Sequence, residues 1–174
     1  KKLNNQKIII GSANFGLNYS RLNSYKKVRI KEIKKIFQYC KKNKISYLDT
    51  ASGYGNAEKI IGNLDISKWK IITKVPKIKS QNTIEIESFL LKTIKNSLKN
   101  LKIKSVYAVL LHDETQLLST NGKKIFKYLN YLKKKKLIKK IGISFYSPRI
   151  LLRTVNHFKI DLIQIPLNYI NKNF

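Results

Sequence analysis

Residues 105–112, SVYAVLLH, decide the fold class of this chain. The run 106–111 is apolar throughout, and the polar residue His112 follows it directly. Unbroken apolar strands are typical of parallel sheets that helices cover. Apolar residues recur at helical spacing on both sides of this strand, within 86–101 before it and 125–132 after it. The stretch therefore predicts a parallel strand between two amphipathic helices.

The same alternation extends over the whole sequence. Helix 86–101 is entered through Thr83 and Glu85, Asn121 is a candidate N-cap for the next helix, and Pro148 suits the first turn of the last. Five strand–helix units followed by a sixth strand predict an α/β fold, either a barrel or a doubly wound sheet, in one domain. The predicted strands are residues 7–13, 45–50, 70–75, 105–111, 138–144 and 162–165, and the predicted helices are 30–43, 57–64, 86–101, 125–132 and 148–158.

Composition excludes several classes of protein. The chain has 174 residues, of which 43% are hydrophobic, enough for a packed core. A single cysteine excludes an internal disulfide, and two histidines make a metal site unfavourable. The longest apolar run is too short to cross a bilayer, and no signal peptide follows Lys1. We therefore expect a cytoplasmic protein without a membrane or metal partner.

The net charge of +28 raises the question of a nucleic-acid partner. Lysine supplies 33 of the 37 basic residues, however, and it is spread along the chain. Phosphate and base recognition favours arginine, so we expect the lysines to be solvated on outer helix faces. Nucleic-acid binding remains the less favoured alternative, with Lys133–Lys136 as its first candidate. The four arginines are Arg21, Arg29, Arg149 and Arg153.

Polar residues follow each predicted strand at its carboxyl end. Any one of them alone could be a helix cap or a surface side chain. The carboxyl ends of barrel strands form one face, where catalysis takes place, so together they predict one shared site. They are Ser12, Asp49, Lys74, His112, Ser144 and Gln164.

Asp49 and Lys74 are expected to form an ion pair, since a lone charge at the tip of a buried strand would be costly. Tyr54 lies in the loop 51–55, where glycines permit a sharp turn over the strand ends. A nearby lysine cation lowers the pKa of a tyrosine from its usual value of about 10. We expect Lys74 to act on Tyr54 in this way and to make it a proton donor. The first loop carries three apolar side chains that either line a substrate pocket or pack down as a plug, namely Phe15, Leu17 and Tyr19.

Six segments, in this order and spacing, resemble the aldo-keto reductase family. The resemblance implies a (β/α)8 TIM barrel, of which residues 1–174 would hold five βα units and the sixth strand as one incomplete domain. The segments are Gly11–Gly16 (GSANFG), Asp49–Gly62 (DTASGYGNAEKIIG), Ile72–Lys74 (ITK), Leu110–Asp113 (LLHD), Gly142–Ser144 (GIS) and Gln164–Asn168 (QIPLN).

The resemblance also implies a reaction and the residues that perform it. An NAD(P)H-dependent oxidoreductase would reduce an aldehyde or ketone to an alcohol, usually with NADPH and possibly with NADH. Tyr54 would be the general acid, Lys74 would lower its pKa, Asp49 would hold Lys74, and His112 would orient the carbonyl group. The partner would be a small carbonyl compound.

Further residues are implied in binding the dinucleotide. Ser144 and Gln164 would contact the nicotinamide carboxamide, and Ser12, beside Asp49, would lie near the ribose. The sequence departs from the family in one place, because Phe145 stands where many members have an asparagine that shares the carboxamide.

The seventh and eighth units of the family have no counterpart in this sequence, and the fold usually takes ~250 residues. We therefore expect a fragment with open edge strands that is poorly soluble and binds the dinucleotide weakly. A monomeric, cooperatively melting preparation with micromolar affinity for NADPH would refute this. The alternative function is a catalytically incompetent barrel fragment or binding module.

Overall fold

The computed structural model describes residues 8–19 and 27–168, and it contains six strands. The strands are β1 (Ile9–Gly11), β2 (Tyr47–Asp49), β3 (Lys70–Val75), β4 (Val106–Leu111), β5 (Ile138–Ser144) and β6 (Leu162–Gln164). The helices are α1 (Ala13–Gly16), α2 (Ile30–Lys42), α3 (Ala57–Ile61), α4 (Thr83–Leu101), the 3-10 turn η2 (Gln116–Leu118), α5 (Gly122–Lys134) and α6 (Pro148–His157).

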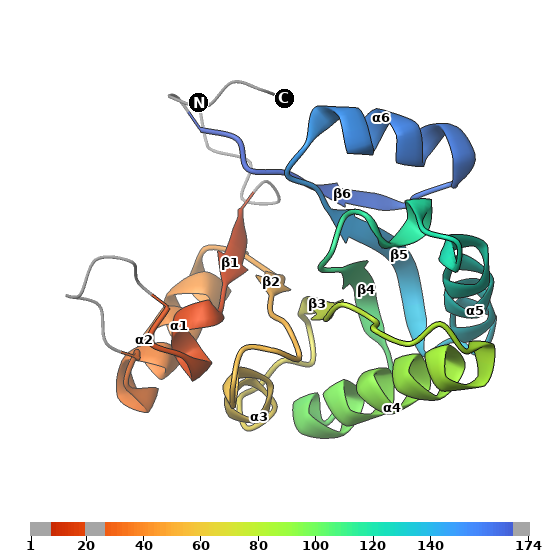
Figure 1. The fold of residues 1–174 in the computed structure, drawn as a ribbon. Helices are drawn as coiled ribbons and strands as arrows, with labels where there is room; N and C mark the ends of the chain where they lie inside the picture. The colour runs from red at the N-terminus through yellow and green to blue at the C-terminus, as the bar shows by residue number, and fades with distance from the viewer. Residues whose placement is uncertain (1–7, 20–26, 169–174) are drawn as a thin grey trace.

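All strand pairs are parallel, and the order in the sheet is the order in the chain, β1 to β6. The helices lie along the outside of the curled sheet (Figure 1). Parallel neighbours joined by helices build a barrel wall one unit at a time. The expected architecture, the first six strands of a (β/α)8 barrel, is confirmed. Within residues 8–19 and 27–168, β1 and β6 are the two edges of the sheet.

Side chains alternate between the two faces of each strand. Outward residues such as Leu48, Ile71 and Val109 join a large apolar core with the helices. Inward residues form a smaller apolar cluster of Ile72, Ala108 and Leu110, against which Leu162 packs. This small cluster is the middle of the barrel interior, and polar side chains occupy the interior at both of its ends.

The predicted strands agree with the structure most closely in its middle. Strands β3 and β5 have the predicted bounds, whereas β1 and β2 are shorter, with three residues each. Asn121 does precede α5, but its side chain makes no cap hydrogen bond and donates instead to the Gln81 side chain. In α6, the buried residue is Thr154, whereas the next residue, Val155, is 36% exposed.

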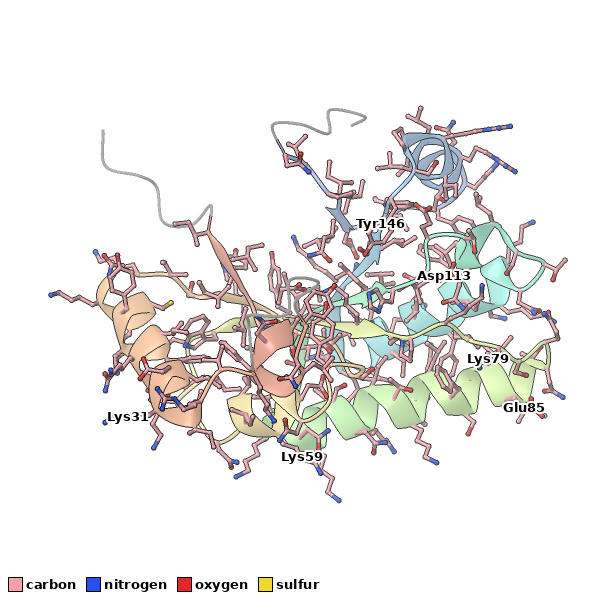
Figure 2. The ribbon with its side chains drawn as sticks, turned by 60° about the vertical axis from the view of Figure 1, so that its left-hand side comes forward. Lys31, Lys59, Lys79, Glu85, Asp113 and Tyr146 are labelled. Atoms are coloured by element: carbon pink, nitrogen blue, oxygen red, sulfur yellow. The ribbon has the colours of Figure 1, made fainter. Side chains whose placement is uncertain are left out.

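The described lysines largely follow the expectation for solvated outer faces. Lys31 on α2 and Lys59 on α3 are exposed and point away from the sheet (Figure 2). Lys74 is the clear exception, since it is buried. No helix within residues 8–19 and 27–168 is long and apolar enough to cross a membrane.

Candidate active site

A buried ion pair lies at the carboxyl end of β2 and β3. Lys74 Nζ is 2.6 Å from both carboxylate oxygens of Asp49, and it also donates to the Thr50 carbonyl oxygen at 3.3 Å. The side chains of Lys74 and Asp49 are only 3% and 14% exposed. Removing one member of such a pair leaves an uncompensated charge inside the protein. The ion pair between Asp49 and Lys74 that the sequence predicts is present in the structure.

The loop after β2 brings Tyr54 over this pair. Ser52 fixes the loop to β3, because its backbone N–H and its hydroxyl both donate to the Lys74 carbonyl oxygen, at 3.2 and 2.9 Å. Gly55 has φ +57°, and a Cβ there would lie 2.7 Å from the Gly16 carbonyl oxygen, so the turn requires glycine. The Tyr54 ring centroid is 5.3 Å from Lys74 Nζ.

His112 completes the group of four side chains. Its ring centroid is 6.4 Å from that of Tyr54, with the two rings nearly perpendicular at 83°. Burial, and the nearby Lys74 cation, lower the pKa of His112. The imidazole is therefore neutral at neutral pH and can donate one N–H without competing as an acid. The structure thus brings together Asp49, Tyr54, Lys74 and His112, which lie far apart in the sequence.

The predicted effect of Lys74 on Tyr54 is wrong. The pKa of Tyr54 is raised to about 12, mainly by burial and next by the Asp49 carboxylate, with smaller contributions from Tyr19 and Tyr146. The main physical reason is burial, which disfavours the charged phenolate, and the Asp49 carboxylate adds to it by repelling a phenolate and neutralising the Lys74 ammonium. Tyr54 is consequently a protonated phenol at any physiological pH.

Three other predicted residues lie at the carboxyl end of the strands, and one of them contacts the Asp49 carboxylate. The Gln164 amide Nε2 donates to Asp49 Oδ2 at 3.3 Å, across the interior from β6 to β2. Ser12 is fully buried, and its hydroxyl and backbone N–H both donate to the Asp49 carbonyl oxygen at 2.9 Å. Ser144 is buried at the end of β5. A cavity of about 390 Å³ beside Tyr54 and Asp49 is lined by residues of the first loop.

A model of the aldo-keto reductase family matches residues 7–172. The chain belongs to the aldo-keto reductase family. Its members are generally NAD(P)H-dependent carbonyl reductases. A comparison with curated proteins found no match.

Solved aldo-keto reductases share the fold. The protein PA4992 from Pseudomonas aeruginosa is 20% identical with TM-score 0.77, over 95% of this chain and 64% of that one. AKR11C1 from Bacillus halodurans, in its holo form, is 19% identical with TM-score 0.73, over 92% and 53%. Thermostable Tm1743, solved with the inhibitor epalrestat, is 20% identical with TM-score 0.68, over 95% and 60%. This chain thus spans less than two thirds of each of these aldo-keto reductases.

The residues at the strand ends fit the carboxamide of the nicotinamide ring. That ring is part of NAD(P)H, the cofactor that this family generally uses. Gln164 Oε1 is buried and has no hydrogen-bond partner among the described residues. A buried acceptor of this kind is costly unless a donor reaches it. A carboxamide N–H₂ is such a donor, and the Ser144 hydroxyl lies on the neighbouring strand, at the register position opposite Gln164.

Phe145, the residue that departs from the family pattern, is turned away from the site. Its side chain is completely buried in the outer core, and its backbone N–H donates to the Gln164 carbonyl oxygen at 2.7 Å. The next residue, Tyr146, is 61% exposed. Phe145 therefore serves packing in the outer core.

One contributor, Glu114, was not singled out by its sequence. Glu114 Oε2 accepts hydrogen bonds from the backbone N–H groups of Tyr146 and Ser147, at 2.6 and 2.9 Å, and so ties the loop after β4 to the loop after β5. No motif distinguishes this glutamate from other surface acids. Tyr19, left open between two roles, is 62% exposed with its ring 6.0 Å from the Tyr54 ring, whereas Phe15 packs into the core.

A metal site finds no support in the described parts of the chain. No group of three or more His, Cys, Asp or Glu side chains that could hold an ion occurs within residues 8–19 and 27–168. The lone cysteine, Cys40, is buried on the inner face of α2.

Proposed function

We propose that this chain carries the proton-transfer half of a carbonyl reductase, with Tyr54 as the general acid. The observation that supports it is the convergence of Tyr54, His112, Lys74 and Asp49 at the carboxyl end of the barrel strands. In barrels of this type, that end is where catalysis takes place.

Tyr54 would give its phenolic proton to the carbonyl oxygen of the substrate. With a pKa raised to about 12, the phenol holds its proton throughout the neutral and mildly alkaline range. His112, neutral because burial lowers its pKa, would donate a hydrogen bond to the same oxygen and fix its orientation. Once Tyr54 has given up its proton, the nearby Lys74 ammonium would stabilise the phenolate. Asp49 would hold Lys74 in place.

When bound, a reduced nicotinamide dinucleotide supplies the hydride that reduces the carbonyl carbon. Ser144 and Gln164 would hold its carboxamide, with Gln164 Oε1 as acceptor. Ser12 lines the cavity beside Tyr54, where a ribose would lie. We expect NADPH as the usual cofactor and NADH as the other possibility, and the substrate to be a small aldehyde or ketone.

The test is Tyr54→Phe, which removes the proton and leaves the ring in place. We expect turnover of a broad aldehyde substrate to fall by about 100- to 10,000-fold, the range for loss of a general acid. NADPH binding, followed by fluorescence, should stay unchanged. Tyr47→Phe, at the opposite end of β2, is the matched control and should retain full turnover.

Two outcomes would overturn the proposal. Turnover that survives in Tyr54→Phe would show that another group supplies the proton. A parent chain that binds NADPH but reduces no carbonyl compound would favour the alternative of a binding module.

A further inference from the structure

A groove of about 710 Å³ lies on the outer surface, and none of the candidate active-site residues lines it. It is bounded by η2 and the start of α5 on one side and by α6 on the other. The turn η2, in the teal middle part of the colour scale of Figure 1, lies against both helices. A cavity of this size is within the range of small-molecule sites.

The floor of the groove is apolar. Leu117 is almost completely buried, and Phe126 and Phe158 meet edge to face with their ring centroids 5.1 Å apart. Leu118 adds a further aliphatic side chain. An apolar surface in a concave site favours a ligand with a hydrocarbon or aromatic body.

The rim of the groove is cationic from both sides. Lys123 and Lys127 stand one turn apart on α5, and Arg153 and His157 stand one turn apart on α6. No acidic residue lines the groove. The ion pairs found within residues 8–19 and 27–168 involve none of these four side chains.

The net charge alone does not produce this arrangement. A second groove, beside Trp69, is lined by Lys41, Lys44 and Lys68, but it also contains Asp65, which pairs with Lys41 at 3.7 Å. The groove between α5 and α6 lacks such a counter-charge among its lining residues and contains one of the four arginines of the chain. Its unpaired cations are therefore available to an anion from outside.

We propose that the groove between α5 and α6 binds an amphipathic organic anion, with a carboxylate or phosphate head and an apolar body. The apolar body would lie on the rings of Phe126 and Phe158. The oxyanion would lie between the Lys127 ammonium and the Arg153 guanidinium, whose planar fork suits carboxylate and phosphate oxygens. This site is separate from the proposed reductase site, and its existence does not depend on that function.

The two histidines of the chain allow ligand binding at the two sites to be followed separately. His157 lines the groove and His112 belongs to the candidate active site, so their ring signals in a ¹H–¹³C NMR titration report the two sites separately. Decanoate, below its micelle concentration, should shift the His157 signals saturably and leave the His112 signals unchanged. Decyl phosphate should do the same, and its affinity relative to decanoate identifies the preferred head. Decanol should bind at least about tenfold more weakly because it lacks the charge.

Charge-reversal variants supply the matched comparison. The double variant Lys127→Glu, Arg153→Glu should weaken decanoate binding by at least about tenfold, because it places two anions at the rim. The control Lys95→Glu, Lys99→Glu makes the same change of net charge on exposed positions one turn apart on α4, and it should retain the affinity of the parent. Unchanged His112 signals and an unchanged melting temperature check that both variants fold.

Each contrary result overturns the proposal. Equal binding of decanol and decanoate would mean that the rim does not select an anion. An equal loss of decanoate affinity in the two double variants would mean that the net charge of the chain, and not this groove, attracts the anion. Shifts at His112 rather than His157 would place the ligand in the other site.

Discussion

Strands β2 and β3 carry a cluster of side chains around one lysine at each of their two ends. At the carboxyl end, Lys74 of β3 is buried against Asp49 of β2. At the amino end, Lys70 of β3 lies opposite Tyr47 of β2, and Lys70 Nζ donates to the Tyr47 phenolic oxygen at 2.9 Å. The rings of Tyr47 and Tyr107 meet edge to face at 5.6 Å in this second cluster.

The pKa values of the tyrosines at the two ends are shifted in opposite directions. The pKa of Tyr47 is lowered, chiefly by its hydrogen bond with Lys70, whereas the pKa of Tyr54 is raised to about 12. Both phenols lie near an ammonium group, so proximity does not explain the difference. Burial explains most of it, since desolvation is the main cause of the raised pKa of Tyr54, and the Asp49 carboxylate adds to it. Lys70 lowers the pKa of Tyr47 because it donates a hydrogen bond directly to that phenol, whereas the Lys74 ammonium is paired with Asp49.

The largest expected effect that tests this comparison follows from Asp49→Asn. The change leaves the buried Lys74 ammonium without its anion and should lower the free energy of unfolding by about 3–5 kcal/mol. Chemical denaturation measures it. The control is Asp65→Asn, since Asp65 pairs with Lys41 at the surface, where such pairs contribute little. If the two variants lose stability equally, the Lys74–Asp49 pair is not a buried one.

The next effect is on the pH dependence of carbonyl reduction, and it rests on the proposed role of Tyr54. Reduction needs the protonated phenol, so activity is present below the pKa of Tyr54 and is lost as pH rises through it. With that pKa near 12, kcat/KM should stay level through pH 10, at pH values where an ordinary tyrosine already ionises. In Asp49→Asn the alkaline fall should move to lower pH. A parent enzyme whose activity falls between pH 8 and 9 would contradict the high pKa.

On the acid side, the lowered pKa of His112 sets the expectation. Its imidazole remains neutral until the pH falls below its ordinary value of 6.5. Activity should therefore persist at pH 6.5, where an ordinary histidine is half protonated, and His112→Asn should change the acid limb of the kcat profile while leaving the alkaline limb in place. An alkaline limb that moves with His112→Asn would assign that limb to the histidine instead of Tyr54.

The smallest effect concerns the amino end of the strands. Lys70→Met should raise the pKa of Tyr47 towards that of an ordinary tyrosine, since it removes the hydrogen bond that lowers it. Stability should change little, because Lys70 is exposed. ¹³Cζ NMR of tyrosine measures the shift, and Lys139→Met, on an exposed position of β5, is the control. If the pKa of Tyr47 were the same in Lys70→Met as in the parent, the hydrogen bond from Lys70 would not be the cause of the lowered pKa.

The sequence predicts the wall of the barrel well, because each strand is a local apolar run and each long helix a local period. The bounds of β3 and β5 follow from Lys70–Val75 and Ile138–Ser144 alone. The short helices α1 and η2, with four and three residues, leave too little periodicity to be recognised. The Asp49–Lys74 pair was also predictable, because both residues directly end buried strands.

What the sequence cannot supply is the relative placement of groups from different elements. The Tyr47–Lys70 contact requires the register of β2 against β3. The raised pKa of Tyr54 depends on how neighbouring elements bury its ring and on how near it lies to the Asp49 carboxylate. The cationic groove depends on how α6 packs beside η2 and α5, and the pattern of each helix alone indicates only solvated lysines.

The most direct test of the account is a ¹³Cζ-tyrosine NMR titration of the parent chain, with Tyr47→Phe and Tyr54→Phe used to assign the two signals. We predict that Tyr47 ionises below the ordinary value of 10, while Tyr54 remains unionised up to the highest pH at which the protein is folded, consistent with a pKa of about 12. If Tyr54 ionised before Tyr47, Lys74 would be acting on it as a free cation, and the raised pKa that burial and Asp49 give to Tyr54 would be contradicted.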